Sequence, residues 1–80
     1  MDPLLVQLGE QIRALREVGE WSQDQLAYVV GTSRNTIARI ERGQQNPTFL
    51  LIAAIAAALQ VKTSELVDGI NAEPPELFSK

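Results

Sequence analysis

The chain has 80 residues, a formal net charge of −3 at pH 7, and neither cysteine nor histidine. These values predict one small domain without disulfides or thiolate metal sites, and they remove the commonest metal ligand and general base. No pair of the remaining groups has a recognisable catalytic spacing, so we expect a protein that is not an enzyme and uses no cofactor. No signal peptide opens the sequence, and its longest apolar run, residues 49–59, is too short to span a bilayer. This predicts a cytoplasmic protein without membrane contact.

The first predicted helix covers residues 3–18. Asp2 and Pro3 form a strong start, because an acidic N-cap accepts hydrogen bonds from the first N–H groups and proline fits the first helical position. Gly19 marks its expected end. Four apolar residues recur at three- or four-residue spacing and form one stripe: Leu5, Leu8, Ile12 and Leu15.

A second, short helix is predicted over residues 23–30. Ser22 and Gln25 have the spacing of a capping box, in which each side chain binds the backbone N–H of the other residue. Gly31 suits the left-handed position that ends many helices.

The third predicted helix covers residues 34–42, with Ser33 as its cap and Gly43 after its end. Only Thr32 and Ser33 separate it from Gly31. A connection this short makes two helices cross steeply, which is typical of a helix-turn-helix motif.

Two further helices are expected, over residues 49–60 with Thr48 as the cap, and over residues 63–69 with a cap near Thr63. The inner face of the fourth helix is predicted to contain Phe49, Ile52, Ile55, Ala56 and Leu59. No segment has the alternating pattern of a strand. The predicted fold class is therefore all-α, a compact bundle of five short helices.

The predicted domain organisation is simple. Residues 1–70 form the helical domain, and residues 71–80 form an acidic tail that contains Pro74 and Pro75.

A family resemblance rests on short segments in a fixed order: Arg13–Arg16, Ser22-Gln23, Leu26-Ala27, Gly31–Ser33, Thr36-Ile37, Ile40–Gly43, Asn46-Pro47, Ile55-Ala56 and Leu59. Together they resemble the Cro/C1-type (Xre-like, lambda-repressor-like) helix-turn-helix DNA-binding domain, over about residues 8–67. The resemblance implies a lambda-repressor-like bundle and a sequence-specific DNA-binding transcriptional regulator. Such a regulator binds a palindromic operator on double-stranded DNA through the major groove as a homodimer, and repression is the expected direction.

Arg34, Asn35 and Arg39 occupy the positions that contact bases in similar repressors. Arginine can bind guanine O6 and N7 with two hydrogen bonds, and asparagine can do the same with adenine N6 and N7. Asn35 and Arg39 are four residues apart and therefore share one helix face. A phosphate contact, or simple exposure to solvent, remains the alternative for each arginine.

Five further residues resemble those that hold the DNA backbone: Gln23, Ser33, Thr36, Arg42 and Gln44. Gln23 lies in the first turn of its helix, where free N–H groups and the helix dipole favour a phosphate. Ser33 and Thr36 have capping and contact with a thymine methyl group as alternatives, and capping is the favoured role of Ser33. Arg42 and Gln44 follow the recognition helix, where similar domains clamp the far phosphates.

A salt bridge is also implied by the resemblance. In similar domains an arginine of the first helix pairs with a glutamate at the end of the third, and here these residues are Arg16 and Glu41. The pair would tie the recognition helix to the first helix. If both groups are exposed, the pair contributes little to stability. Trp21 is expected at the edge of the core.

The charges are unevenly distributed. Residues 32–47 carry three arginines against one acid, whereas residues 63–80 carry four acids against Lys80 alone. A local field can attract DNA even when the total charge does not. Because phosphates supply most non-specific affinity, the acidic total predicts weaker and more salt-sensitive binding than a basic domain would show.

The fourth predicted helix has no polar side chain between Phe49 and Leu59. A helix that is apolar on every side is normally buried on every side, which an 80-residue monomer cannot achieve. We therefore expect this helix to form much of a two-fold dimer interface, with contributions from Leu50, Leu51, Ala54, Ala57 and Ile70.

A second class of function remains open. The same fold can serve as a protein-interaction module, for example in an antitoxin, and tail residues Leu77 and Phe78 are candidates for docking a protein partner. Failure to bind any duplex specifically would favour this alternative.

Overall fold

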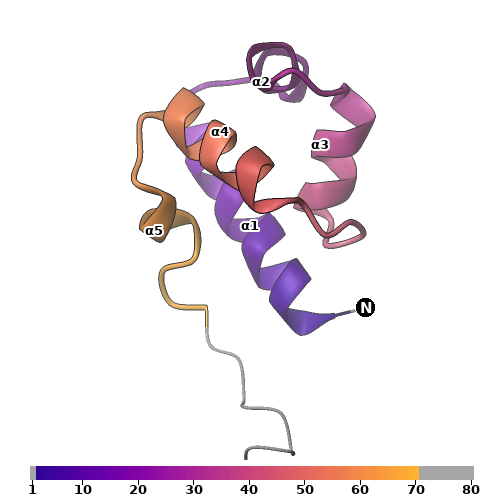
Figure 1. Ribbon diagram of the computed structural model, residues 1–80, viewed down its shortest axis with the longest axis vertical. Coiled ribbons are helices and arrows are strands. Elements are labelled where there is room, and N and C mark those ends of the chain that lie inside the picture. The colour runs from indigo at the N-terminus through magenta and orange to yellow at the C-terminus, as the bar shows by residue number, and fades with distance from the viewer. Residues whose placement is uncertain (1, 71–80) are drawn as a thin grey trace, which may run out of the picture.

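The computed structural model describes residues 2–70 (Figure 1). Five helices make up this part of the chain: α1 (Pro3–Val18), α2 (Gln23–Val30), α3 (Arg34–Glu41), α4 (Phe49–Leu59) and α5 (Thr63–Leu66). No strand occurs within these residues, so the predicted all-α class is confirmed. The tail at residues 71–80, with Leu77 and Phe78, lies outside the described residues.

The predicted caps of α1 and α2 are present. The Asp2 carboxylate accepts a hydrogen bond from the Leu4 N–H at 2.8 Å. In the capping box of α2, Ser22 Oγ accepts from the Gln25 N–H at 3.0 Å, and Gln25 Oε1 accepts from the Ser22 N–H at 2.8 Å. These bonds satisfy N–H groups that a helix start leaves without partners, which fixes where both helices begin.

The turn between α2 and α3 also follows the sequence pattern. Gly31 has a φ of 78°, the left-handed conformation that glycine adopts without a steric cost. Ser33 Oγ accepts from the Thr36 N–H at 3.1 Å and thereby caps α3. The two helices pack closely against each other, and α3 also packs against α1.

The core lies where α1, α2, α3, α4 and α5 meet. Its buried apolar residues are Leu8, Ile12, Leu26, Ala27, Ile37, Ile40, Ile55, Ala56 and Leu66. Trp21 is partly buried and packs against this cluster, as expected. Figure 1 shows α3 and α5 on opposite sides of the bundle. Arg34, Asn35 and Arg39 on α3 are exposed.

The end of α3 makes an unusually close approach to α1. Gly43 is buried with a φ of 72°, and a Cβ built on it would lie 2.8 Å from the Cα of Val6. Only glycine satisfies both conditions, so the chain turns away from α3 directly against the first turn of α1.

Several predicted helix boundaries need correction. α3 ends at Glu41 and α4 at Leu59, one residue earlier than predicted in each case. α5 ends at Leu66 rather than at residue 69. Thr63 is the first helical residue and not the cap, because Lys62 is the N-cap and its N–H donates to Glu65 Oε1 at 3.2 Å.

The prediction that Phe49 faces the core is wrong, because this residue is 71% exposed. Phe49 is the first residue of α4, and helical side chains lean toward the N-terminus, so it projects beyond the end of the core. Leu51 packs against the core instead. Within residues 2–70, no helix combines the length and the apolar character needed to cross a bilayer.

Candidate nucleic-acid interface

Helix α3 has two faces with different roles. Ile37 and Ile40 are buried in the core, whereas Arg34, Asn35 and Arg39 are exposed. The exposed side chains lie on the part of α3 that no other helix covers. The same short helix therefore anchors itself on one side and presents donors and acceptors on the other.

The orientation of α3 is held by a buried ion pair between Arg16 and Glu41, the two residues that the resemblance pairs. Arg16 Nε lies 2.6 Å from Glu41 Oε2, and Arg16 Nη2 lies 3.0 Å from Glu41 Oε1. The side chains are only 10% and 3% exposed. This arrangement is the parallel two-bond geometry that makes arginine–carboxylate pairs strong and directional.

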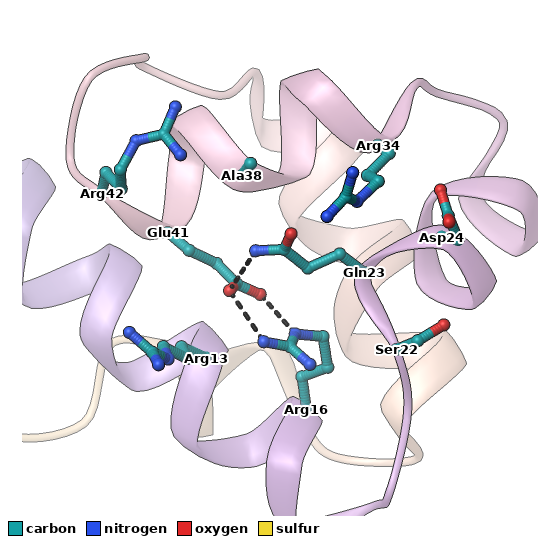
Figure 2. Close-up of a pocket in the computed structure, with 9 residues that line it drawn as sticks. All are labelled: Arg13, Arg16, Ser22, Gln23, Asp24, Arg34, Ala38, Glu41 and Arg42. Carbon is teal, nitrogen blue, oxygen red and sulfur yellow. Dashed lines mark hydrogen bonds and ion pairs between the residues drawn. The ribbon is translucent and has the colours of Figure 1, made fainter.

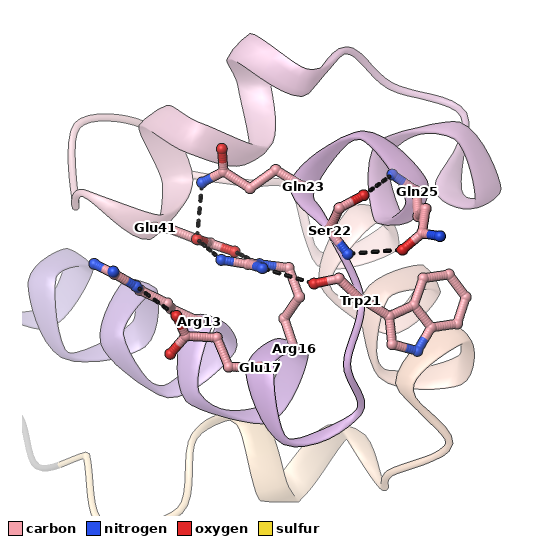
Figure 3. A network of polar contacts seen from close by, with 8 residues as sticks. All are labelled: Arg13, Arg16, Glu17, Trp21, Ser22, Gln23, Gln25 and Glu41. Atoms are coloured by element: carbon pink, nitrogen blue, oxygen red, sulfur yellow. Dashed lines mark hydrogen bonds and ion pairs between the residues drawn. The ribbon is translucent and has the colours of Figure 1, made fainter.

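Arg16 makes a third bond within the same network, in which Nη1 donates to the Trp21 carbonyl at 2.7 Å (Figure 3). The hydrogen bonds to Glu41, reinforced by its negative charge, raise the pKa of Arg16 above its ordinary value, although burial acts in the opposite direction. Arg16 therefore stays charged, and its donors are divided between α3 and the segment that leads into α2.

Gln23 extends the network to α2. Its Nε2 donates to Glu41 Oε1 at 3.0 Å, so one carboxylate joins α1, α2 and α3. Since a buried carboxylate accepts only, this bond fixes which end of the Gln23 amide faces inward. In Figure 2 the amide oxygen of Gln23 points away from Glu41.

A hollow of about 520 Å³ opens beside this network (Figure 2). Its lining comes from α1, the start of α2 and one edge of α3: Arg13, Arg16, Ser22, Gln23, Asp24, Arg34, Ala38, Glu41 and Arg42. A second, smaller hollow of about 410 Å³ shares Gln23, Arg34, Ala38 and Arg42 with it and adds Asn35. The two hollows form one continuous surface along α3.

The structure thus brings some of the predicted residues together and leaves others apart. Gln23, Arg34, Asn35 and Arg42 line the hollows, whereas Arg39 lines neither of them. Gln44 is joined to this surface through Arg42, whose Nε donates to Gln44 Oε1 at 3.0 Å.

Ser33 and Thr36 interact with each other at the start of α3. Their hydroxyl oxygens lie 2.9 Å apart, and Ser33 Oγ also accepts the Thr36 N–H. The capping role favoured for Ser33 is therefore present in the structure, and the Thr36 hydroxyl is already hydrogen-bonded.

Arg13 is a residue of the hollow that the sequence did not single out as a site residue. It lies three positions before Arg16 and therefore on the same face of α1. That spacing was the available signal. Arg13 forms a long ion pair with Glu17, with Nε and Oε2 3.4 Å apart, and both side chains are largely exposed.

The residues expected at a dimer interface differ in how much surface they offer. Leu50 is 80% exposed, and Ala57 is also exposed. Ala54 is partly buried, and Leu51 and Ile70 pack against the core. The unpredicted exposure of Phe49 adds to the apolar surface around Leu50.

Comparisons with known proteins agree with this geometry. A family model described as a helix-turn-helix domain matches residues 7–68. The immunity repressor protein of Bacillus phage phi105 is 37% identical over 60 residues, which are 75% of this chain and 42% of that protein. The chain therefore spans less than half the length of this relative.

Two solved structures are similar over most of the chain. The restriction-modification controller protein C.AhdI from Aeromonas hydrophila gives a TM-score of 0.76 at 37% identity, covering 78% of this chain and 94% of its own. The P22 c2 repressor, in complex with a synthetic operator, gives a TM-score of 0.72 at 34% identity, covering 78% of this chain and 94% of its own.

The network predicts a large stability difference between two glutamate substitutions. Glu41→Ala strands the buried charge of Arg16 and should lower the free energy of unfolding by about 3 kcal/mol. Glu17→Ala breaks only the exposed pair with Arg13 and should change the free energy of unfolding by less than about 0.5 kcal/mol. Urea denaturation followed by circular dichroism measures both. Equal losses in the two variants would contradict the assignment of Arg16–Glu41 as the tie that holds α3.

Proposed function

Because the chain belongs to the helix-turn-helix domain family, we propose that it is a sequence-specific DNA-binding transcriptional regulator, most simply a repressor. The observation that carries the proposal is α3, which is locked to α1 and α2 through Glu41 while Arg34, Asn35 and Arg39 project into solvent. In this role the protein acts in the cytoplasm, without a cofactor and without catalysing a reaction.

The exposed end of α3 has the chemistry of a base-reading element. A recognition helix enters the major groove with its N-terminal residues at the base edges. Arg34 and Arg39 suit guanine, and Asn35 suits adenine, because each can form a pair of hydrogen bonds with its base. Ile37 and Ile40 keep the opposite face of α3 in the core, so the helix enters the groove in one orientation.

Residues around α3 are assigned to the DNA backbone. Gln23 stands at the first turn of α2, and Arg42 and Gln44 follow α3 in the chain. Gln44 holds Arg42 at Nε, which leaves its two terminal nitrogens for a phosphate. The hydroxyls of Ser33 and Thr36, at the start of α3, are the remaining groups assigned to the DNA backbone. Such contacts set the register of the protein on the duplex and carry no sequence information.

The protein is proposed to act as a homodimer on a palindromic operator. A net charge of −3 limits what one copy can gain from the phosphate backbone. Two copies related by a two-fold axis would read half-sites about 34–36 Å apart, one turn of the duplex. The P22 c2 repressor structure, which contains an operator, supports binding of DNA by this fold.

The dimer surface is assigned to the exposed side of α4. Phe49 and Leu50 are 71% and 80% exposed, and Val67 after α5 is 46% exposed. Phe49 and Leu50 are adjacent at the start of α4, and exposed apolar side chains that are contiguous usually mark an interface. Ala54 and Ala57 are small enough to let two helices approach closely. Leu51 and Ile70 support this face from the core side, since both pack inward.

The function is tested by selecting bound duplexes from a random pool. The expected product is a palindrome with guanine and adenine in each half-site. Arg39→Ala should then relax the preference at one position in each half-site, at a cost of about 1–3 kcal/mol of discrimination. Lys62→Ala, which alters an exposed cation beside α5, should leave the preference intact.

Two results would count against this function. Selection of no common sequence by the wild-type protein would favour the protein-interaction alternative. Retention of every preference by Arg39→Ala would remove Arg39 from the base-reading residues.

The dimer surface is tested separately. Leu50→Glu places a charge in the apolar interface and should raise the dimer dissociation constant by at least about 100-fold, equivalent to roughly 3 kcal/mol. Val18→Glu is the matched control, because Val18 is 82% exposed at the end of α1. Sedimentation velocity over a concentration series gives both constants. A Leu50→Glu protein that dimerises like the control would show that α4 is not the interface.

A further inference from the structure

Gly9 lies in the interior of α1, where glycine is an unfavourable residue. Glycine destabilises the middle of a helix relative to alanine, because it loses more backbone freedom on folding. Unlike Gly31, Gly43 and Gly69, Gly9 has no positive φ that would call for glycine. It is also buried. The reason for glycine at this position therefore lies in what packs against it.

The backbone at the end of α3 packs directly against Gly9. A Cβ built on Gly9 would lie 2.3 Å from the Ile40 carbonyl oxygen and 2.6 Å from the Glu41 carbonyl oxygen. These are main-chain atoms, so no change of side-chain rotamer can make room for a methyl group. The missing side chain lets the end of α3 rest on the backbone of α1.

The residue that closes the turn after α3 makes a second approach to the same part of α1. A Cβ built on Gly43 would lie 2.8 Å from the Val6 Cα. Val6 and Gly9 are three residues apart and therefore share one face of α1. Residues 40–43 thus lie against one turn of α1 through main-chain contacts at two points.

These contacts and the Glu41 network act on α3 in opposite directions. The hydrogen bonds from Arg16 and Gln23 hold the Glu41 carboxylate, and with it the end of α3, toward α1 and α2. The backbone contact at Gly9 sets how near to α1 that end can come. In a close-packed interior even one added methyl group changes such a distance.

We propose that Gly9 is a positioning residue for base reading, because it sets the distance between α1 and the end of α3. The inference rests on the proposed function, in which α3 enters the major groove. Ordinary van der Waals contact begins at 3.4 Å, against the 2.3 Å available to a Cβ, so an alanine moves the end of α3 outward by about 1 Å. A binding constellation needs placement within about 0.5 Å.

The displacement is unequal along α3. The start of this helix packs on α2 and is joined to it by the short turn at Gly31. Arg39 directly precedes the displaced end, whereas Asn35 lies one turn nearer the start. Of the proposed base-reading residues, Arg39 is therefore the one whose position depends most on Gly9.

The first measurement repeats the selection of bound duplexes with Gly9→Ala. The preference at the base that Arg39→Ala identifies should fall by about tenfold, which is within the range that one bidentate contact supplies. The preference assigned to Asn35 should fall by less than about threefold, since the start of α3 moves less. Equal losses at the two bases, or no loss at either, would overturn the proposal.

Ala56→Gly is the control for a general loss of stability. Ala56 is 1% exposed, and its helix α4 packs mainly against α2 and α5. Removing its methyl group weakens the same core without pushing on α3. This control should keep every base preference of the wild type. A control that loses the same preference as Gly9→Ala would show that Gly9 acts through stability alone.

Both measurements require a folded Gly9→Ala protein, which circular dichroism establishes. Trimethylamine N-oxide favours the compact state and is added to all proteins when the variant is partly unfolded. A variant that stays unfolded would show that α3 cannot move outward to accept the methyl group. That result would replace the positioning role of Gly9 with a purely structural one.

The second measurement needs no DNA. Residual dipolar couplings of the backbone N–H groups give the orientation of α3 relative to α1. A displacement of about 1 Å at one end of an eight-residue helix, about 12 Å long, is a tilt of about 5°. Gly9→Ala should show this tilt, and an unchanged orientation would overturn the proposal. If the wild type selects no common sequence, the proposed function fails, and the couplings still decide whether Gly9 sets the position of α3.

Discussion

The structure depends on one carboxylate. Glu41 is buried at the end of α3 and accepts two hydrogen bonds from Arg16 of α1 and one from Gln23 of α2. A buried charge is tolerated only when it is paired and fully hydrogen-bonded, so these three partners must stay in place together. The hydrogen bonds that stabilise the buried charge of Glu41 therefore also fix the position of α3 relative to α1 and α2.

This constraint is what allows a helix of eight residues to be proposed as a base-reading element. Ile37, Ile40 and Glu41 occupy its buried side. Arg34, Asn35 and Arg39 are exposed and take no part in the core. The hydrogen bond to Glu41 also fixes the orientation of the Gln23 side chain, which lines the hollow at the first turn of α2. On α3, folding thus uses the buried side chains, and the proposed DNA contacts use the exposed ones.

Much of the fold was predictable because its signals are local. Caps at Ser22 and Ser33 and the left-handed Gly31 depend on residues within one turn, and all are present. The exposure of Phe49 and the short α5 were missed because they depend on where the core ends in space. The pairing of Arg16 with Glu41 came from a family resemblance, since 25 positions separate them. The part of Arg13 in the hollow needed the structure, because the hollow is formed by three helices.

The central claim is that Glu41 orients α3 for reading rather than only stabilising it. The most direct test compares Glu41→Gln with the wild type at a temperature where both are folded, using the selected operator and a random duplex of equal length. The account predicts that the ratio of operator to random affinity falls on the order of tenfold, about 1.4 kcal/mol, while random-duplex affinity changes little. An unchanged ratio in a folded Glu41→Gln protein would contradict it.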